Sequence, residues 1–435
     1  MSTRLFYALA VVAVIFIFSY WINAFYAVGW ISLWGLFLLV LIDIVSLFQK
    51  SNGIIAERHL PEKFSNSDIN DVQVSIKNNY GFTINVKTID EIPVQFQKRD
   101  FHKEIKIPAK TRKKFSYGLQ PYERGEYVFG NLNLYVNSRI NLVAKRYKFE
   151  KDQMVKVYPS FIQMKKYAFL AIDNKLSQFG LKKIRRLGHT MEFEQIKDYV
   201  AGDDVRTINW KATAKRASLM INQYQDEKSQ PIYSVIDGSR IMKMPFENLT
   251  LLDYAINSTL AFSNVALKKG DKTGMLTFSN TILNHLAPSN KKTHLNTIME
   301  VLYNIDTKFL DSDFGRLYAE VKRKITHRSL LLLYTNFEHM SGLQRQLPYL
   351  KGIARQHVLV VIFFENTELR ELVDDKAANT IEIYNKAIAQ KFEYDKKLMV
   401  KELEKHGIQT ILTRPENLTI NTINKYLEIK ARGIL

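Results

Sequence analysis

Three aspartates carry the side chains that a metal-dependent hydrolase needs. Asp203 and Asp204 follow Gly202 directly, and Asp237 comes at the end of an apolar run. Such carboxylates can bind a cation that activates water, or act as general acid and base. Adjacent residues on one turn usually point apart, so we expect a structural role for Asp203 and Asp204. A hydrolase that uses Asp203, Asp204 and Asp237 is kept as the alternative function.

Motifs that mark common enzyme classes are missing from the sequence. It contains no G-x-x-x-x-G-K-[ST], no G-x-S-x-G and no H-E-x-x-H, and its nine histidines are scattered. It contains no cysteine, which excludes disulfides, thiolate zinc clusters and thiol nucleophiles. We therefore expect a protein that is not an enzyme and that requires no cofactor.

The densest group of glycine, acidic, basic and aromatic residues lies between residues 192 and 215. Gly202 and the two aspartates after it predict a tight turn into a helix from Val205 to Ala214. One of the aspartates would cap this helix and pair with Arg206. Trp210 has a large apolar body with one hydrogen-bond donor, which suits it to docking one domain on another.

This segment resembles the signature of the bacterial domain-of-unknown-function 58 family. The matching residues are Glu192, Phe193, Tyr199, Gly202, Asp203, Arg206, Ile208, Asn209, Trp210, Thr213, Ala214 and Lys215. The resemblance implies a von Willebrand factor A-like, Rossmann-like α/β domain and a MoxR-type AAA+ ATPase as a partner. It implies no catalytic residues. The candidate partner-binding residues are Glu192, Phe193, Tyr199, Gly202, Asp203, Asp204, Arg206 and Trp210.

The resemblance also implies a candidate Mg²⁺ site, which in von Willebrand factor A domains uses an Asp-x-Ser-x-Ser turn with a distant Thr and Asp. Asp237 and Ser239 fit this turn, but Ile241 replaces the second hydroxyl. Asn336 stands where the distant Asp is expected, and Thr293 is the candidate for the distant Thr. A hard cation needs oxygen ligands, so we expect the degenerate site to hold Mg²⁺ poorly. Asp237 and Ser239 would instead cap the turn after their strand.

Two apolar runs predict a hairpin of two transmembrane helices in residues 1–50. Leu5–Ile22 has no charged residue, and Trp30–Phe48 has only Asp43. Each is close to the ~20 residues that cross a bilayer as a helix. Residues 23–29 would connect the two helices. Asp43 is so near the end of its run that we expect it to pair or to reach the headgroups.

The flanking charges predict an orientation in the inner, cytoplasmic membrane. Arg4 precedes the first run and Lys50 follows the second, while the connection carries no charge. By the positive-inside rule, both ends and the soluble domains would then lie in the cytoplasm. The rival interpretation is a cleaved signal peptide followed by one anchor, but no small-x-small cleavage site follows the first run.

The soluble part changes pattern twice. Residues 51–160 contain short alternating runs such as 71–76 and 83–89, which predict an antiparallel β-sandwich or small barrel. Residues 161–230 form a linker with the family signature. In residues 231–435 strands alternate with helices, which predicts a mainly parallel, doubly wound sheet. Its expected strands are Ile232–Ile236, Thr273–Phe278, Ser329–Thr335, Val358–Phe364 and Thr410–Leu412.

The net charge of +19 is consistent with binding to nucleic acid, an anionic membrane face or an acidic partner. The membrane face is the simplest of these explanations, and we find no nucleic-acid-binding motif. The sequence therefore predicts a membrane-anchored cytoplasmic scaffold that binds protein partners through its von Willebrand factor A-like domain. A MoxR-type AAA+ ATPase is the suspected partner, and the sequence does not name the client protein.

Overall fold

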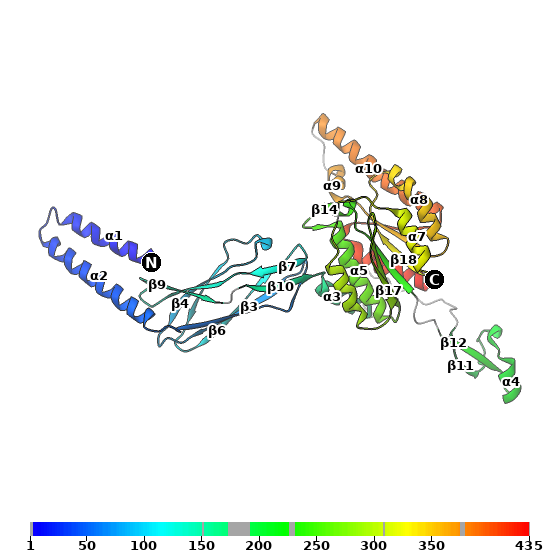
Figure 1. The fold of residues 1–435 in the computed structure, drawn as a ribbon, viewed down its shortest axis with the longest axis horizontal. Helices are drawn as coiled ribbons and strands as arrows, with labels where there is room; N and C mark the ends of the chain where they lie inside the picture. The colour runs from blue at the N-terminus through cyan, green and yellow to red at the C-terminus, as the bar shows by residue number, and fades with distance from the viewer. Residues whose placement is uncertain are drawn as a thin grey trace. The chain divides into compact units, whose positions relative to one another are not determined.

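The computed structural model of this chain describes residues 3–149, 152–172, 192–225, 231–307, 309–374 and 379–434. The chain divides into two compact units, Met1–Tyr158 and Pro159–Leu435, which can be followed in Figure 1. Each unit has hydrophobic cores of its own.

The first unit begins with two apolar helices, α1 (Thr3–Phe18) and α2 (Ala24–Phe48). They lie side by side, and the rings of Phe16 and Trp30 are 6.0 Å apart. Among the described residues, α2 is the helix long and apolar enough to cross a membrane, whereas α1 has only 16 residues. One of the two predicted spans therefore reaches the required length.

The connection predicted at residues 23–29 is wrong. α2 already begins at Ala24, because residues 24–28 contain no helix breaker. Gly29 lies inside the helix against Phe16, where a Cβ atom would come within 2.8 Å of the ring. The turn between the helices is residues 19–23.

The rest of the first unit is a β-sandwich. Its strands are β1 (Ile54–His59), β2 (Lys63–Ser65), β3 (Asn70–Asn78), β4 (Ile84–Asp90), β5 (His102–Ile107), β6 (Arg112–Leu119), β7 (Gly125–Phe129), β8 (Leu132–Asn137), β9 (Ala144–Phe149) and β10 (Gln153–Tyr158). They form the sheets β1-β3-β6, β5-β4-β8-β9 and β2-β10-β7. Ile54 and Val74 from the first sheet share a core with Val86 and Leu134 from the second. The predicted alternating runs are present as strands.

The second unit begins with α3 (Phe161–Ile172), followed by residues 173–191, which lie outside the described part. Residues 192–225 form a small module, in which β11 (Glu192–Asp198) pairs antiparallel with β12 (Met220–Gln225). A 3-10 turn at Val205–Thr207 and the helix α4 (Trp210–Arg216) lie between these strands in the sequence.

The continuous helix predicted from Val205 to Ala214 is wrong. Ile208 is extended and bridges Ile221, so the 3-10 turn cannot continue. Asn209 then starts α4 by accepting a hydrogen bond from the Ala212 N–H with its side chain, at 3.0 Å.

A six-stranded sheet forms the centre of the second unit, in the order β17-β16-β13-β18-β19-β20. Its strands are β13 (Pro231–Asp237), β16 (Lys272–Phe278), β17 (Ile282–Ser289), β18 (Leu330–Tyr334), β19 (Val358–Phe364) and β20 (Gln409–Thr413). All pairings are parallel except that of β16 with the edge strand β17. The five predicted strands are present, and β17 is an addition that the sequence pattern does not reveal.

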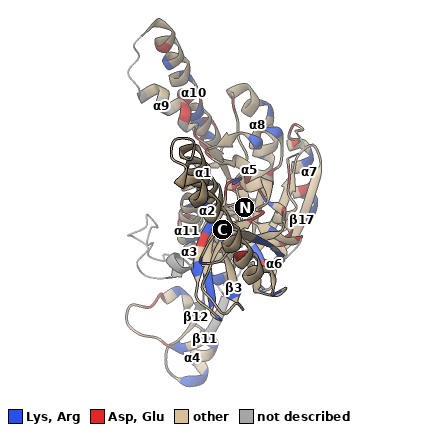
Figure 2. Cartoon of the chain, turned by 90° about the vertical axis from the view of Figure 1, so that its left-hand side faces the viewer, with Lys and Arg blue, Asp and Glu red and all other residues tan. Residues whose placement is uncertain are grey.

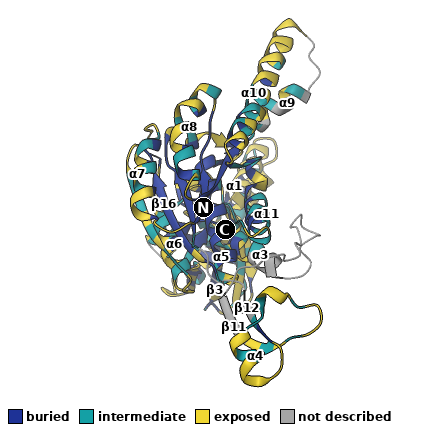
Figure 3. Ribbon diagram, turned by 90° about the vertical axis from the view of Figure 1, so that its right-hand side faces the viewer, coloured by how far each residue is buried: buried dark blue, intermediate teal, exposed yellow. Residues whose placement is uncertain are grey.

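Helices cover both faces of this sheet, and the strands between them are buried (Figure 3). α5 (Leu251–Lys268), α6 (His294–Tyr303) and α11 (Leu418–Ala431) pack on one face. α7 (Phe314–Lys324), α8 (Met340–Ala354) and α10 (Thr380–Lys405) pack on the other, and α9 (Thr367–Asp374) precedes α10 in the chain. The doubly wound arrangement predicted from the sequence is confirmed.

A short hairpin and a capping box set the start of α5. Residues 245–250 form a short hairpin, β14 (Pro245–Phe246) with β15 (Leu249–Thr250). Thr250 then closes a capping box with Asp253, in which each side chain bonds the other residue's backbone N–H.

Candidate functional site

The carboxyl ends of the parallel strands meet at one edge of the sheet, where α/β proteins usually bind ligands. Asp237 ends β13, Thr335 and Asn336 follow β18, and Phe364 ends β19. The register places these ends level, since Asp237 pairs with Phe278 and Ile236 with Tyr334. We refer to this region as the carboxyl edge.

Asp237 is fully buried at the carboxyl edge, and neighbouring donors use both of its oxygens. The Ser312 hydroxyl lies 2.8 Å from Oδ1 and 2.7 Å from Oδ2. Thr335 donates to Oδ2 at 2.7 Å, and the Ser239 N–H donates to Oδ1 at 3.0 Å. Burial raises the pKa of Asp237, and these hydrogen bonds oppose the increase. Asp237 is thus the shared acceptor of three hydrogen-bond donors, whereas the buried Ser239 hydroxyl has no partner among the described residues.

The hydroxyl groups around Asp237 differ from those expected for the Mg²⁺ site. The hydroxyls that approach Asp237 come from Ser312 and Thr335, not from Thr293 as expected. Thr293 precedes His294, whose Nε2 is 2.8 Å from the Thr273 carbonyl oxygen at the opposite edge of the sheet. The antiparallel strand β17 carries the chain to that side, which explains the error.

Asn336 is also unavailable to a cation. Its Oδ1 accepts a hydrogen bond from Lys396 at 2.7 Å, and an ammonium there repels a second positive charge. Within the described residues, no group of three or more His, Cys, Asp or Glu side chains could hold a metal ion. The hydrolase alternative therefore has no ligand cluster in this part of the chain.

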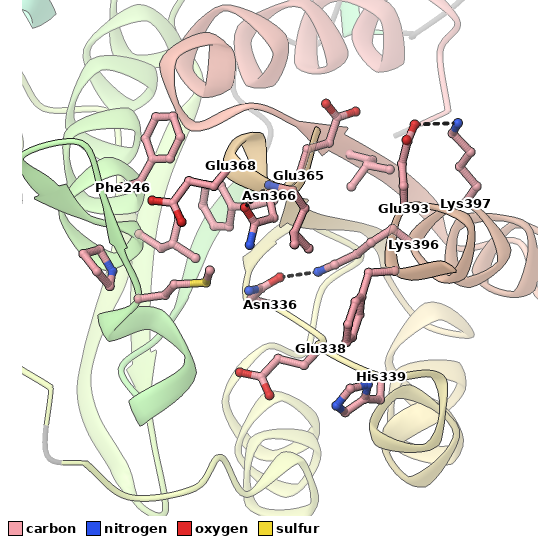
Figure 4. A pocket seen from close by; sticks show the side chains of 17 residues that line it. Phe246, Asn336, Glu338, His339, Glu365, Asn366, Glu368, Glu393, Lys396 and Lys397 are labelled. Carbon is pink, nitrogen blue, oxygen red and sulfur yellow. Dashed lines mark hydrogen bonds and ion pairs between the residues drawn. The ribbon is translucent and has the colours of Figure 1, made fainter. Parts of the chain in front are cut away.

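Beside Asn336, the carboxyl edge contains a pocket of about 290 Å³. Lys396 of α10 reaches into it, and Figure 4 shows its ammonium pointing at Asn336. The ammonium also lies 5.5 Å from the centre of the Phe363 ring. Burial lowers the pKa of Lys396 to about 8, and the nearby Glu338 partly opposes the decrease. The pocket thus contains a positive charge that burial disfavours.

The pocket wall is largely apolar, and four glutamates are among its polar residues. Phe246, Phe364 and Phe392 supply aromatic surface. Glu338 and Glu368 are exposed members of the lining. Sequence reasoning missed Lys396, because it lies in an amphipathic helix among several other lysines that face solvent.

The residues of the family signature make local contacts within the 192–225 module. Asp203 accepts the Val200 N–H at 3.0 Å and lies 3.2 Å from Lys197 Nζ, and these contacts lower its pKa. Asp204 caps the 3-10 turn by accepting the Arg206 N–H at 3.0 Å. The expected cap is therefore present, but the hydrogen bond joins Asp204 to the backbone of Arg206.

The same module exposes apolar side chains. Trp210 is 71% exposed, and Val200 and Val205 are each 63% exposed. Gly202 has a positive φ of 111°, a conformation that favours glycine in the turn before the two aspartates. Glu192 and Phe193 contribute backbone pairing to β11, and Tyr199 follows that strand.

Residues 195–399 match the family model described as "Protein of unknown function DUF58". This segment of the chain belongs to the family. The match covers a little under half of the chain and includes most of the small module, β13 and the pocket residues of α10. It confirms the resemblance drawn from the signature, and the family description assigns no function.

One curated relative is the uncharacterized protein YeaD of Bacillus subtilis (strain 168), which is 25% identical over 160 residues. That alignment covers 37% of this chain and 38% of YeaD. Among solved structures, the conserved hypothetical protein BatB of Bacteroides thetaiotaomicron has a TM-score of 0.33 at 13% identity, covering 47% of this chain and 99% of BatB. A PapD-like domain of human CEP192 has a TM-score of 0.18 at 10% identity, covering 23% and 82%. TM-scores this low support no argument about this chain.

Proposed function

We propose that this chain is a membrane-anchored cytoplasmic scaffold that binds a partner protein at the carboxyl edge, and that it is not an enzyme. In this proposal the second unit is a von Willebrand factor A-like domain that binds without a metal ion. The parallel sheet with Asp237 at the end of its central strand supports that assignment. The membrane anchor is α2, whose length and composition suit a bilayer.

The observation that carries the proposal is the ammonium of Lys396 in the pocket. An ammonium has three donors, and among the described residues Asn336 is its one hydrogen-bond acceptor. A carboxylate from a partner would accept from the remaining donors and compensate for the buried charge. Phe246, Phe364 and Phe392 would hold an apolar side chain beside that carboxylate.

The acidic rim of the pocket restricts the charge of the ligand that can bind there. Glu338 and Glu368 are exposed there and repel a free anion. An acidic anchor residue flanked by Lys or Arg would satisfy both the ammonium and the rim. We therefore propose a short protein motif as the ligand rather than a small anion.

The family resemblance suggests a MoxR-type AAA+ ATPase as the partner protein. To test this, the tagged full-length chain is solubilised from its native membrane under ATP-trapping conditions, and co-purifying proteins are identified. Lys396→Met removes the ammonium, and Lys401→Met is the matched control because Lys401 is exposed on the same helix and does not line the pocket. Trp210→Ala tests the exposed surface of the signature module.

Recovery of the ATPase with the parent and Lys401→Met, and its loss with Lys396→Met, is the expected result. Equal recovery with Lys396→Met would overturn the assignment to the carboxyl edge. A loss confined to Trp210→Ala would move the contact to the signature module. Absence of the ATPase from the parent preparation would overturn the choice of partner.

A further inference from the structure

The end of α2 is built into the β-sandwich of the first unit. Asp43 is buried, and its Oδ2 accepts the backbone N–H groups of Leu142 at 2.9 Å and Val143 at 2.8 Å. Leu47 is fully buried in the sandwich core, and its carbonyl accepts the Tyr80 hydroxyl at 2.7 Å. One face of the last turns of α2 is therefore packed against the sandwich, while Ile44, Val45 and Phe48 remain exposed.

This attachment limits how much of α2 can lie in lipid. Asp43 is the first residue of α2 whose side chain forms a hydrogen bond with the sandwich. Residues 24–42 are therefore the part of α2 that can lie in the bilayer. At 1.5 Å per residue they extend about 28 Å, close to the ~30 Å hydrocarbon thickness of a bilayer. The end of the sandwich nearest Asp43 would then lie at the headgroups.

Strand register shows which segments share that end. Ile54, the first residue of β1, pairs with Asn78 at the end of β3. Ile84 at the start of β4 pairs with Ile107 at the end of β5, and Asn137 pairs with Ala144. The loops 49–53, 79–83, 108–111 and 138–143 therefore all lie at the end of the sandwich where α2 enters.

Apart from the buried Asp43, the charged residues around these loops are basic. Residues 44–56, 72–89, 105–122 and 127–149 contain no Asp or Glu. Six basic residues near the loops form what we call the basic collar: Lys50, Lys77, Lys110, Arg112, Arg139 and Lys145. All are exposed except Lys145, which is half-buried and donates to the carbonyl oxygens of Leu47 and Lys50. Figure 2 colours the basic and acidic residues along the chain.

We propose that the basic collar binds the headgroups of anionic phospholipids in the membrane that α2 crosses. This inference rests on the membrane anchoring proposed above. Anionic headgroups attract basic residues only within about a Debye length, roughly 8–10 Å in physiological salt. The basic residues near the end loops lie within a Debye length of the headgroups. The acidic residues of the sandwich lie farther along the strands, away from these loops. An acidic protein as the ligand is the competing outcome.

The test uses the full-length protein reconstituted in nanodiscs of mixed phosphatidylcholine and phosphatidylglycerol. The lipids that stay bound after exchange into detergent are counted by native mass spectrometry. Lys110→Glu/Arg112→Glu reverses two exposed charges of the collar, and Lys98→Glu/Arg99→Glu makes the same charge change away from it. Arg139→Glu is a second collar variant, in a different loop.

We expect the parent and the Lys98/Arg99 variant to retain phosphatidylglycerol in preference to phosphatidylcholine. The Lys110/Arg112 variant should lose on the order of tenfold in that preference, and Arg139→Glu should lose part of it. Equal preference in all variants, or none in the parent, would overturn the lipid assignment, and capture of an acidic protein in place of lipid would do the same. Carbonate extraction separates the two proposals, because release of the parent from membranes would refute the anchoring itself.

Discussion

At the scale of single residues, Lys396 lowers the stability of the fold and provides the ammonium that we propose binds a partner's carboxylate. Its pKa is lowered from 10.5 to about 8, because burial disfavours the ammonium. A lysine with a depressed folded pKa contributes stability above the unfolded pKa and loses it as the pH falls through the folded pKa. At pH 7 the charged side chain therefore destabilises the fold.

We accordingly expect Lys396→Met to raise the free energy of unfolding at neutral pH by about 1 kcal/mol, although it leaves Asn336 without its donor. The advantage should shrink as the pH rises between about 8 and 10.5, because the parent then loses its proton in both states. Denaturant unfolding at several pH values measures this, with Lys401→Met as the control. A variant less stable than the parent at every pH would contradict the prediction.

Asp237 offers a second prediction at this scale. Asp237→Ala leaves the hydroxyls of Ser312 and Thr335 without their acceptor, so we expect a loss of about 2–3 kcal/mol of stability. Asp237→Asn keeps the shape and one acceptor oxygen, and it removes a carboxylate whose burial raises its pKa. We therefore expect a much smaller effect from Asn than from Ala.

The same two variants test the metal interpretation by calorimetric titration with Mg²⁺. We expect no specific heat of binding from the parent, since Ser312 and Thr335 use the oxygens of Asp237. Tight binding to the parent that disappears in Asp237→Asn would reinstate the metal site and, with it, the hydrolase alternative.

Part of the candidate site could be predicted from the sequence. Asp237 was identifiable because a polar residue after a buried strand marks the carboxyl edge. Thr293 was misplaced, because the sequence does not show that β17 runs antiparallel. Lys396 was not identifiable, because only the tertiary fold distinguishes it from exposed lysines such as Lys401.

At the scale of elements, long apolar or alternating runs were predictable and irregular junctions were not. β18 and β19 are uninterrupted apolar runs, as buried parallel strands should be, and β13 is apolar except for Ser234 and its last residue, Asp237. β17 is only partly buried and lacks a clear alternation. α8 contains Pro348, and because proline is disfavoured inside helices, the sequence does not predict a helix there.

A buried ion pair joins two sheets of the sandwich and yields a prediction for these elements. Arg58 of β1 lies 2.5 Å from Asp90 of β4, and both side chains are inaccessible to solvent. Tyr117 donates a hydrogen bond to the same carboxylate, and the carbonyl of Gly130 accepts one from Arg58. Burial raises the pKa of Asp90 in spite of Arg58.

We expect Arg58→Met to lower the free energy of unfolding by about 3 kcal/mol, because it leaves a buried carboxylate without its cation. The deficit should diminish as the pH falls, since protonation of Asp90, whose pKa burial raises, removes the unpaired charge. The double variant Arg58→Met/Asp90→Leu should recover most of the loss, with Arg99→Met as an exposed control. A double variant no more stable than Arg58→Met would show that the pair contributes more than charge balance.

At the scale of the whole molecule, the distribution of charge predicts an orientation. The turn at residues 19–23 carries no charge, whereas the basic collar lies at the other end of the α2 segment available to lipid. Phe16 packs near Gly29, so Arg4, 12 residues earlier in α1, lies about level with residue 41 of α2. The basic residues that flank both helices thus gather on one side, which the positive-inside rule assigns to the cytoplasm.

We therefore expect protease added to intact spheroplasts to leave both soluble units uncut, and to digest them once detergent opens the membrane. A tag at the C-terminus reports the result by immunoblot, with a periplasmic protein as the control for access and a cytoplasmic protein as the control for integrity. Digestion in intact spheroplasts would place the soluble units outside the membrane. The carboxyl edge could then not meet a cytoplasmic ATPase, and an adhesion role in the cell envelope would become the better explanation.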